Sequence, residues 1–271
     1  MKQLQNRLAL VTGAGSGIGR ATALALAEEG VRVIVTDLLE RSANDTAAQI
    51  RSRGHWAEAR QLDVADLDQM KQLALELEQS PGSPDILVNN AGIAVAGLFL
   101  DVSMQNFRKI VDINMMGVVN GCYAFLPAMV RNGRPAHIVN IASMAAYVSA
   151  VRMTAYCTTK SAVLGFSECL RAEMVSHEIG VSAICPGVIK TNIVNSGILE
   201  ASDVDVEQKR KEIVALYEKR NYSPERVARA IIKAVKKNRA VAPVTPEAWV
   251  TYYLKRWTPW VISWLARRDL A

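Results

Sequence analysis

The feature that most constrains the fold of this chain is the glycine-rich stretch TGAGSGIGR at residues 12–20. It follows the short apolar run LALV at residues 8–11 and opens a helical pattern that stops at Gly30. Glycine lets a chain turn tightly, lets a backbone approach a pyrophosphate and lets a helix pack closely on a strand. The free N–H groups at a helix N-terminus bind phosphate oxygens. The stretch therefore predicts a dinucleotide-binding strand–turn–helix unit; the alternative is an ordinary glycine-rich turn.

Strand-like and helix-like segments alternate along the rest of the chain. Half of its 271 residues are hydrophobic, which is enough for one large core. The expected strands are residues 7–13, 31–37, 57–64, 85–92, 136–143, 180–187 and 239–244. The expected helices are residues 18–29, 39–53, 67–79 and 103–131, one that holds Tyr156 and Lys160, and one that begins at Ser223 and Pro224. This alternation predicts a Rossmann-like, doubly wound α/β fold, whose mostly parallel seven-stranded sheet has helices on both faces.

Composition excludes several functional classes. We expect residues 1–246 to form a single domain, because no linker, repeat or low-complexity tract interrupts them. The net charge is only +6 and the basic residues are spread out, so we expect no nucleic-acid partner. The four cysteines and three histidines lack metal-ligand spacing, which predicts no metal site. Isolated cysteines and a first apolar run too short for a signal peptide favour a cytoplasmic protein with reduced thiols.

Ligands of open parallel sheets bind beyond the carboxyl ends of the strands, and Asp37 ends the expected second strand. A carboxylate there can accept hydrogen bonds from the hydroxyls of an adenosine ribose, and it would repel a 2′-phosphate. Neither Ser16 nor Leu38 supplies a compensating cation. The sequence therefore favours NAD over NADP, although Asp37 could instead cap the next helix.

Tyr156 and Lys160 lie four residues apart in a run of small and apolar residues. Residues at this spacing share one face of a helix. An ammonium beside a phenol can lower the pKa of the phenol and prepare it to move protons. The alternative is that the tyrosine packs in the core while the lysine extends to water.

With these residues in hand, the chain resembles the short-chain dehydrogenase/reductase family. Residues 12–19 are similar to the family's Thr-Gly-x-x-x-Gly-x-Gly loop, and residues 156–160 to its Tyr-x-x-x-Lys pair. Further matches are NNAG at residues 89–92, Asn114, Ser143, the Pro-Gly pair at residues 186–187, and Thr191. Each motif alone is weak, but all of them occur in the family's order on the expected elements. The resemblance spans about residues 8–244 and implies an NAD(P)-dependent oxidoreductase.

The resemblance also assigns roles. It implies that Tyr156 is the general acid/base, that Lys160 supports it and binds the nicotinamide ribose, and that Ser143 hydrogen-bonds the substrate oxygen. Asn114 would hold a water near Lys160 in a proton relay. Taken alone, Ser143 could equally cap a turn, and Asn114 could satisfy backbone groups. The expected cofactor-binding residues are Gly13, Gly15, Ser16, Gly17, Ile18, Gly19, Asp37, Leu38, Asp63, Val64, Asn90, Ala91, Gly92, Tyr156, Lys160, Pro186, Gly187, Val188 and Thr191.

The implied reaction interconverts a secondary alcohol and a ketone, or an alcohol and an aldehyde. Apolar residues are expected to face the substrate, namely Ile93, Ala94, Val95, Met144, Ala145, Tyr147, Val148 and Met153. They favour a lipophilic substrate, unless they belong to the core. Residues 191–221 resemble the family's mobile lid. The alternatives are an epimerase or dehydratase of the same fold, and a non-catalytic dinucleotide sensor, against which the intact Ser143, Tyr156 and Lys160 argue.

Residues 247–271 form an aromatic and basic extension beyond the region of resemblance. Four of the five tryptophans of the chain lie here, and Pro259 should break or kink the helix. Exposed aromatic surface is costly, so we expect the extension to pack on a subunit interface or on a lipid surface.

The family resemblance further implies a homotetramer or homodimer, formed through the helices that hold Asn114 and Tyr156. An apolar stripe on these helices supports it: Val118, Val119, Phe125, Leu126, Ala162, Val163, Phe166 and Leu170.

Overall fold

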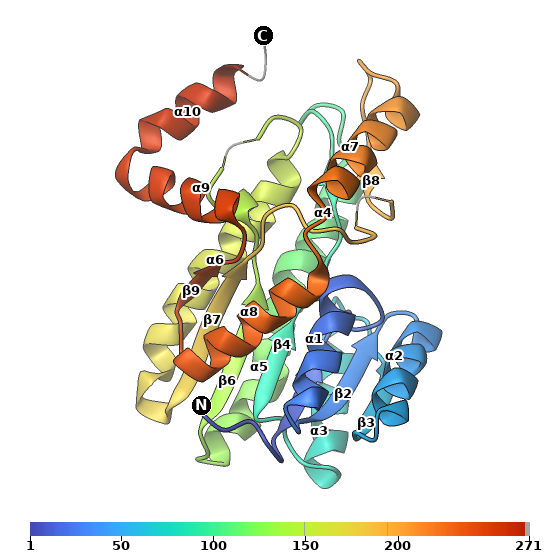
Figure 1. Ribbon diagram of the computed structural model, residues 1–271, viewed down its shortest axis with the longest axis vertical. Coiled ribbons are helices and arrows are strands. Elements are labelled where there is room, and N and C mark those ends of the chain that lie inside the picture. Colours follow the sequence, from blue (N-terminus) through green and yellow to red (C-terminus); the bar gives the residue numbers. More distant parts are fainter. Residues whose placement is uncertain (149, 194, 269–271) are drawn as a thin grey trace.

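Seven short strands pair in parallel in the computed structural model, which describes residues 1–148, 150–193 and 195–268 (Figure 1). The strands are β1 (Leu8–Val11), β2 (Arg32–Asp37), β3 (Ala57–Gln61), β4 (Ile86–Asn89), β6 (Ala136–Ile141), β7 (Ile179–Cys185) and β9 (Val241–Pro243). Their order in the sheet is β3-β2-β1-β4-β6-β7-β9, and every neighbouring pair is parallel. A separate parallel pair joins β5 (Val95–Ala96) to β8 (Ile198–Leu199). The predicted fold class is confirmed.

Helices cover both faces of the sheet (Figure 1). They are α1 (Gly17–Glu28), α2 (Glu40–Ser52), α3 (Leu67–Gln79), α4 (Met104–Val111), α5 (Gly117–Arg131), α6 (Thr154–Glu173), α7 (Val206–Arg220), α8 (Pro224–Lys237), α9 (Pro246–Trp257) and α10 (Pro259–Arg268). Successive strand residues point to opposite faces. Accordingly, Val33 packs in one core cluster with residues of α1, α2 and α8, and Ile34 in a second with residues of α3, α5 and α6.

The expected strands were too long at their carboxyl ends. β1, β4, β6 and β7 stop before the glycine loop, the Asn-Ala-Gly motif, Ser143 and the Pro-Gly pair, respectively. Beyond these ends the regular pairing of the sheet stops, and only single backbone bonds remain, such as that from Thr12 N to the Val88 carbonyl at 3.0 Å. The residues that carry the motifs are therefore gathered along one edge of the sheet, as expected for the ligand side of an open parallel sheet.

The expected helix at residues 103–131 contains an irregular turn. α4 and α5 are joined by a π-helical turn at Asp112–Met116, so the segment is not one regular α-helix. Asn114 lies in this wide turn, and a side chain that bonds backbone outside its own helix is one cause of such a bulge. By length and composition, residues 104–131 could also span a membrane, but 56% of the most apolar window is buried within the fold. We interpret this segment as a core helix.

The apolar stripe expected to support oligomerisation is largely used within the chain itself. Val118, Phe125, Val163 and Leu170 are at most 8% exposed and pack in the core. Only the other four residues of the stripe remain half-buried. This stripe therefore supports an oligomer less than the sequence suggested, and the oligomer stays a prediction.

A helical glycine sets how closely α5 approaches β4. A β-carbon at Gly121 would lie 2.2 Å from Oδ1 of Asn89, whose side chain is buried and donates to Asn140 at 2.9 Å. We therefore predict that Gly121→Ala lowers the free energy of unfolding by about 1–3 kcal/mol through overpacking. Chemical denaturation measures this change.

Gly165 in α6 provides the matched control, because a β-carbon there meets nothing within 4 Å. Gly165→Ala should leave stability unchanged or raise it by up to about 1 kcal/mol through helix propensity. Equal effects of the two substitutions would contradict the close packing of α5 on β4.

Candidate active site

The loops after β1 and β4 are fastened to each other. The Thr12 hydroxyl accepts hydrogen bonds from the backbone N–H groups of Asn90 (2.9 Å) and Ala91 (3.1 Å). The Asn90 side chain donates in return to the carbonyls of Thr12 (2.9 Å) and Gly13 (3.2 Å). A β-carbon at Gly13 would lie 2.8 Å from Cα of Ala91, and Gly13 has a φ of +60°. Only glycine fits this junction without displacing the neighbouring backbone.

The first turn of α1 provides a cradle for phosphate. A β-carbon at Gly19 would lie 2.2 Å from the Gly13 carbonyl oxygen, so the helix begins directly against the loop. The N-cap Ser16 makes no side-chain hydrogen bond to the helix, and the first turn has no acidic residue. The N–H groups of this turn are thus left for an anion. Gly17 and Ile18 open the helix beside the cradle, which fits the pyrophosphate of a dinucleotide.

The adenosine side of the site is arranged around Asp37 at the end of β2. Its carboxylate accepts hydrogen bonds from the backbone N–H groups of Gly15 (2.9 Å) and Leu39 (3.0 Å). Asp37 thus shapes the glycine loop and forms a local turn with Leu39, but it does not cap α2, whose N-cap Leu39 has no side-chain cap hydrogen bond. Leu38 beside it is 56% exposed.

The loops after β3 and β4 complete this side. Asp63 bonds the backbone N–H of Ala65 at 2.9 Å, and the Val64 carbonyl accepts from the Asn120 side chain at 2.9 Å. Val64 is itself buried and packs against Gly117 of α5. Gly92 is exposed and lies next to the side chains of Asn114 and Lys160.

Asn114, Ser143, Tyr156 and Lys160 are brought together at the carboxyl end of β6. Lys160 is 4% exposed; its Nζ donates to the Ile141 carbonyl at 2.8 Å and lies 5.7 Å from the centre of the Tyr156 ring. The Ser143 hydroxyl accepts from Ala145 N at 3.1 Å, so Ser143 does cap a short turn.

Asn114 bridges from the π turn to the loop after β4. Its Oδ1 accepts from Ile93 N at 2.8 Å, and its Nδ2 donates to the Ile93 carbonyl at 2.9 Å and to Thr159 at 3.4 Å. Its amide therefore does satisfy backbone groups, as the structural alternative proposed. The same bonds hold it beside Gly92, within the group that contains Lys160.

Burial shifts the pKa values of both titratable residues of this group toward their neutral forms. Burial raises the pKa of Tyr156, and a hydrogen bond with Ser143 opposes the shift. Burial also lowers the pKa of Lys160 from 10.5 to about 8. Burial therefore outweighs the expected lowering of the phenol pKa by Lys160. The physical reason is that the phenol is buried, while the ammonium is directed to the Ile141 carbonyl.

Three of the residues expected to face a substrate belong to the core instead. Val95, Ala145 and Tyr147 are at most 7% exposed. Tyr147 packs edge-on against Tyr252 of α9, with ring centres 5.3 Å apart, because the C-terminal segment covers it. The remaining five are half-buried near the loops after β4 and β6: Ile93, Ala94, Met144, Val148 and Met153.

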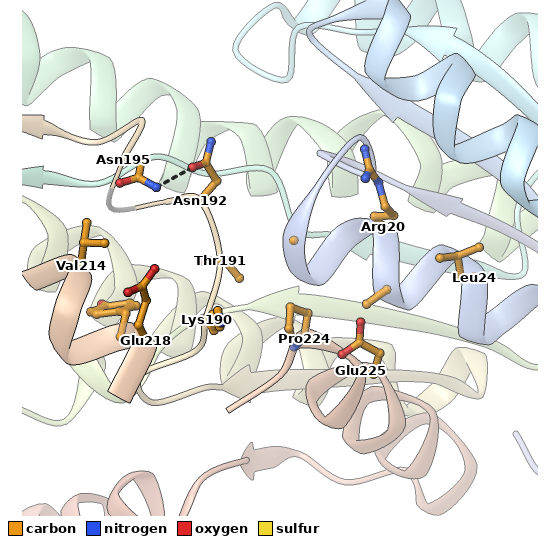
Figure 2. Close-up of a pocket in the computed structure, with 13 residues that line it drawn as sticks. Arg20, Leu24, Lys190, Thr191, Asn192, Asn195, Val214, Glu218, Pro224 and Glu225 are labelled. Carbon is orange, nitrogen blue, oxygen red and sulfur yellow. Dashed lines mark hydrogen bonds between the residues drawn. The ribbon is translucent and has the colours of Figure 1, made fainter. Parts of the chain in front are cut away.

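A cavity of about 410 Å³ opens where the loop after β7 passes the start of α1 (Figure 2). Thr191 lies against Gly17, and Tyr217 of α7 lines the far side. Asn195 donates to Asn192 at 2.9 Å within the loop, as the dashed line in Figure 2 shows. The expected lid segment thus folds over the phosphate cradle.

Sequence reasoning missed a contact between the C-terminal segment and the Pro186–Gly187–Val188 loop. A β-carbon at Gly187 would lie 2.2 Å from Oγ1 of Thr245. Glu247 accepts a hydrogen bond from Val188 N at 3.4 Å and forms an ion pair with Arg220 at the end of α7. Because these residues are far apart in sequence and share no motif, no sequence signal could have placed Glu247 here.

We predict that Lys160→Met raises the free energy of unfolding at pH 7 by about 1–3 kcal/mol, because it removes a buried ammonium. The folded-state pKa of Lys160 lies below its unfolded value, so between about pH 8 and 10.5 the unfolded chain binds more protons. Wild-type stability should gain in that window, and the advantage of the variant should shrink. Urea denaturation at pH 7 and pH 10 measures both values; a variant less stable than wild type at pH 7 would contradict the burial cost.

Comparisons with known proteins agree with this arrangement. Residues 7–200 match the family model described as short chain dehydrogenase. The chain is 45% identical over 263 residues to the probable oxidoreductase EphD of Mycobacterium tuberculosis. That match covers 96% of this chain but 44% of EphD, so the chain spans less than half of this relative's length.

Solved structures give the same picture. A short-chain dehydrogenase/reductase from Burkholderia phymatum, in complex with NAD, superposes with a TM-score of 0.87 at 26% identity and covers 94% of both chains. A single-residue variant of the actinorhodin polyketide ketoreductase, with NADPH, has a TM-score of 0.78 at 29% identity, with 92% of this chain and 99% of that chain covered. With its parallel sheet, its glycine cradle and the matched family model, the chain belongs to the short-chain dehydrogenase/reductase family of oxidoreductases.

Proposed function

We propose that this chain is an NAD-dependent oxidoreductase that interconverts a secondary alcohol and a ketone, or an alcohol and an aldehyde, on an apolar substrate. The observation that carries the proposal is the position of Tyr156, Ser143 and Lys160. They share one buried corner beside Gly92, on the same sheet edge as the glycine cradle. The alternative, a core tyrosine beside a lysine that extends to water, does not fit, because Lys160 is only 4% exposed.

The residues of this chain fit a dinucleotide. The first turn of α1 would bind the pyrophosphate, Asp37 the adenosine ribose, and the loop at residues 186–191 the nicotinamide end. The loop at residues 90–92 would line the adenine and ribose side of the dinucleotide. The bound nicotinamide would supply hydride transfer to or from the substrate carbon.

The side chains of the protein would transfer the proton. In the oxidation direction, the phenolate form of Tyr156 would accept the proton of the substrate hydroxyl, and in the reduction direction the phenol would return it to the substrate oxygen. Ser143 would hold the substrate oxygen by a hydrogen bond and stabilise its changing charge. Lys160 would stabilise the phenolate and pass the proton toward solvent, with Asn114 positioning a water. Burial alone raises the pKa of Tyr156, so we expect the positive charge of an oxidised cofactor to be needed to lower it.

The preference for NAD follows from charge at the ribose. Asp37 would meet a 2′-phosphate with a like charge, and neither Ser16 nor Leu38 is a cation. Arg20, four residues after Ser16, donates to Thr46 at 3.1 Å and to the Gly15 carbonyl, so it is already engaged within the protein. Structural relatives of both kinds exist, because the two noted above hold NAD and NADPH.

The proposed substrate is lipophilic, because the half-buried residues around the group are apolar. Ile93, Met144 and Met153 are the main contributors, and Tyr217 of α7 faces the cavity from the expected lid. We further propose a homodimer or homotetramer, mainly on the family resemblance, and a cytoplasmic location, on the isolated cysteines and the short first apolar run.

We predict that Tyr156→Phe lowers kcat by at least about 100-fold, because it removes the oxygen that moves the proton. Cofactor affinity should change little, since the substitution removes little volume. A panel of apolar alcohols and ketones with NAD⁺, NADP⁺ and their reduced forms, followed at the absorbance of reduced nicotinamide, identifies a substrate and then measures the variant.

Tyr123→Phe is the matched control, because Tyr123 is 65% exposed on α5, where its ring lies beside Lys71. It should retain wild-type kcat. Turnover by Tyr156→Phe above a few per cent of wild type would refute the proton-transfer role. A wild-type protein that binds neither dinucleotide would refute the proposed function as a whole.

We also predict that the ratio of kcat/KM for NAD over NADP favours NAD and falls at least about tenfold in Asp37→Asn, which removes a like charge at nearly constant shape. Asp45→Asn, a charge-matched change on the exposed side of α2, should leave the ratio unchanged. Steady-state kinetics with each cofactor measure the ratio, and a wild-type preference for NADP would overturn the assignment of Asp37.

A further inference from the structure

The two C-terminal helices have one anchored side and one exposed aromatic side. On the anchored side, Ala248 and Ile262 are at most 4% exposed, and Tyr252 packs on Tyr147. On the other side, Trp257 is 76% exposed and Trp260 is 71% exposed. α9 is therefore held on the fold and α10 packs on α9, while two indoles point outward. We call Tyr253, Trp257 and Trp260 the tail face.

Such exposure is unusual for this residue type. Tryptophan has a large apolar ring and is normally well buried, while its N–H makes it suited to a boundary between water and an apolar phase. Tyr253 is also half-exposed and stacks on Trp249, with ring centres 5.8 Å apart. The exposed Tyr253 ring is thus supported by Trp249 beneath it.

Further exposed apolar residues lie at the same end of the molecule. Phe99 (60%) and Leu100 (92%) precede α4, and Leu216 (57%) lies on α7. In Figure 1, α7, α9 and α10 all rise beyond the end of the sheet where the candidate site opens. The ion pair between Arg220 and Glu247 joins α7 to α9. The exposed apolar residues therefore lie at the end of the sheet where the candidate site opens, and not at its far end.

The charge of this segment indicates what it would contact. Residues 248–268 contain Lys255, Arg256, Arg267 and Arg268, and no aspartate or glutamate. Basic residues among interfacial aromatic residues are typical of helices that lie on anionic lipid. A second copy of this chain would bring an equal positive charge to the same face, which disfavours self-association there.

We propose that the tail face is a docking surface for an anionic lipid bilayer, on which α9 and α10 lie in the interfacial plane. α10 has ten residues and α9 has twelve, separated by Thr258, so neither can span a bilayer. Docking would place the entrance to the site close to molecules dissolved in the lipid. The binding itself does not depend on the proposed reaction.

Co-sedimentation of the full chain with vesicles tests the proposal. Vesicles of phosphatidylglycerol and phosphatidylcholine in equal parts should bind the protein, and pure phosphatidylcholine vesicles should bind it more weakly. Trp257→Ala/Trp260→Ala should lower the partition coefficient at least about tenfold, because two indoles leave the interface. Lys255→Glu/Arg256→Glu should weaken binding, and added salt should weaken wild-type binding.

Trp56→Ala is the matched control, because Trp56 is exposed but precedes β3, away from the tail face. It should bind vesicles like wild type. The melting temperature should be unchanged in the tail variants, since the altered side chains are exposed. Wild-type protein that fails to bind anionic vesicles, or a double tryptophan variant that binds them equally, would overturn the proposal. If light scattering also showed that the double variant loses an oligomer, the face would be a subunit interface instead.

Discussion

The junction between the loops after β1 and β4 determines where the candidate site lies. From β1, the chain adds β2 and β3 on one side of the sheet, while β4, β6, β7 and β9 extend the other side. The strand order therefore reverses between β1 and β4, which is where open parallel sheets bind their ligands. Thr12 and Asn90 fasten the loops together, and Gly13 leaves no space for a β-carbon between them. The phosphate cradle and the Tyr156 corner both take their positions from this junction.

The buried lysine shows how the fold accommodates a group that burial disfavours. Lys160 has one carbonyl partner, Ile141, and burial lowers its pKa to about 8. A core residue selected only for stability would be apolar at this position, so the ammonium is retained at a cost to stability. The same burial raises the pKa of Tyr156. Activation of the phenol therefore needs a nearby positive charge, which an oxidised cofactor would supply.

The fold and the location of the site could be predicted because both follow from local patterns. Apolar runs that end in glycine or asparagine predicted the strands, and parallel pairing then placed the residues after Val11, Asn89 and Ile141 on one edge. The spacing of Tyr156 and Lys160 predicted that they share a helix face, which the structure confirms. The strand ends and the π turn at Asn114 could not be predicted, because they depend on which backbone groups find partners in three dimensions.

Contacts between distant segments were also beyond the sequence. The sequence predicted that Tyr147 contacts the substrate, whereas α9 covers it in the structure. Glu247 reaches Val188 because β9 pairs with β7 and returns the chain to the edge of the sheet. The pKa of Tyr156 could not be predicted for the same reason. The spacing of Tyr156 and Lys160 along the helix suggested a lowered pKa, whereas burial of the phenol raises it. The sequence patterns therefore predicted which residues form the site, while their burial and pKa values depend on packing in three dimensions.

Isotope transfer tests the central claim most directly, namely that this corner exchanges a hydride with a nicotinamide cofactor while the protein moves only the proton. A ketone accepted by the enzyme would be reduced in ordinary water with NADH deuterated at the transferred position of C4. The account predicts one deuterium on the carbinol carbon of the product and none in the water. Product without deuterium, or deuterium released to solvent, would contradict direct hydride transfer and favour epimerisation or dehydration on the same fold.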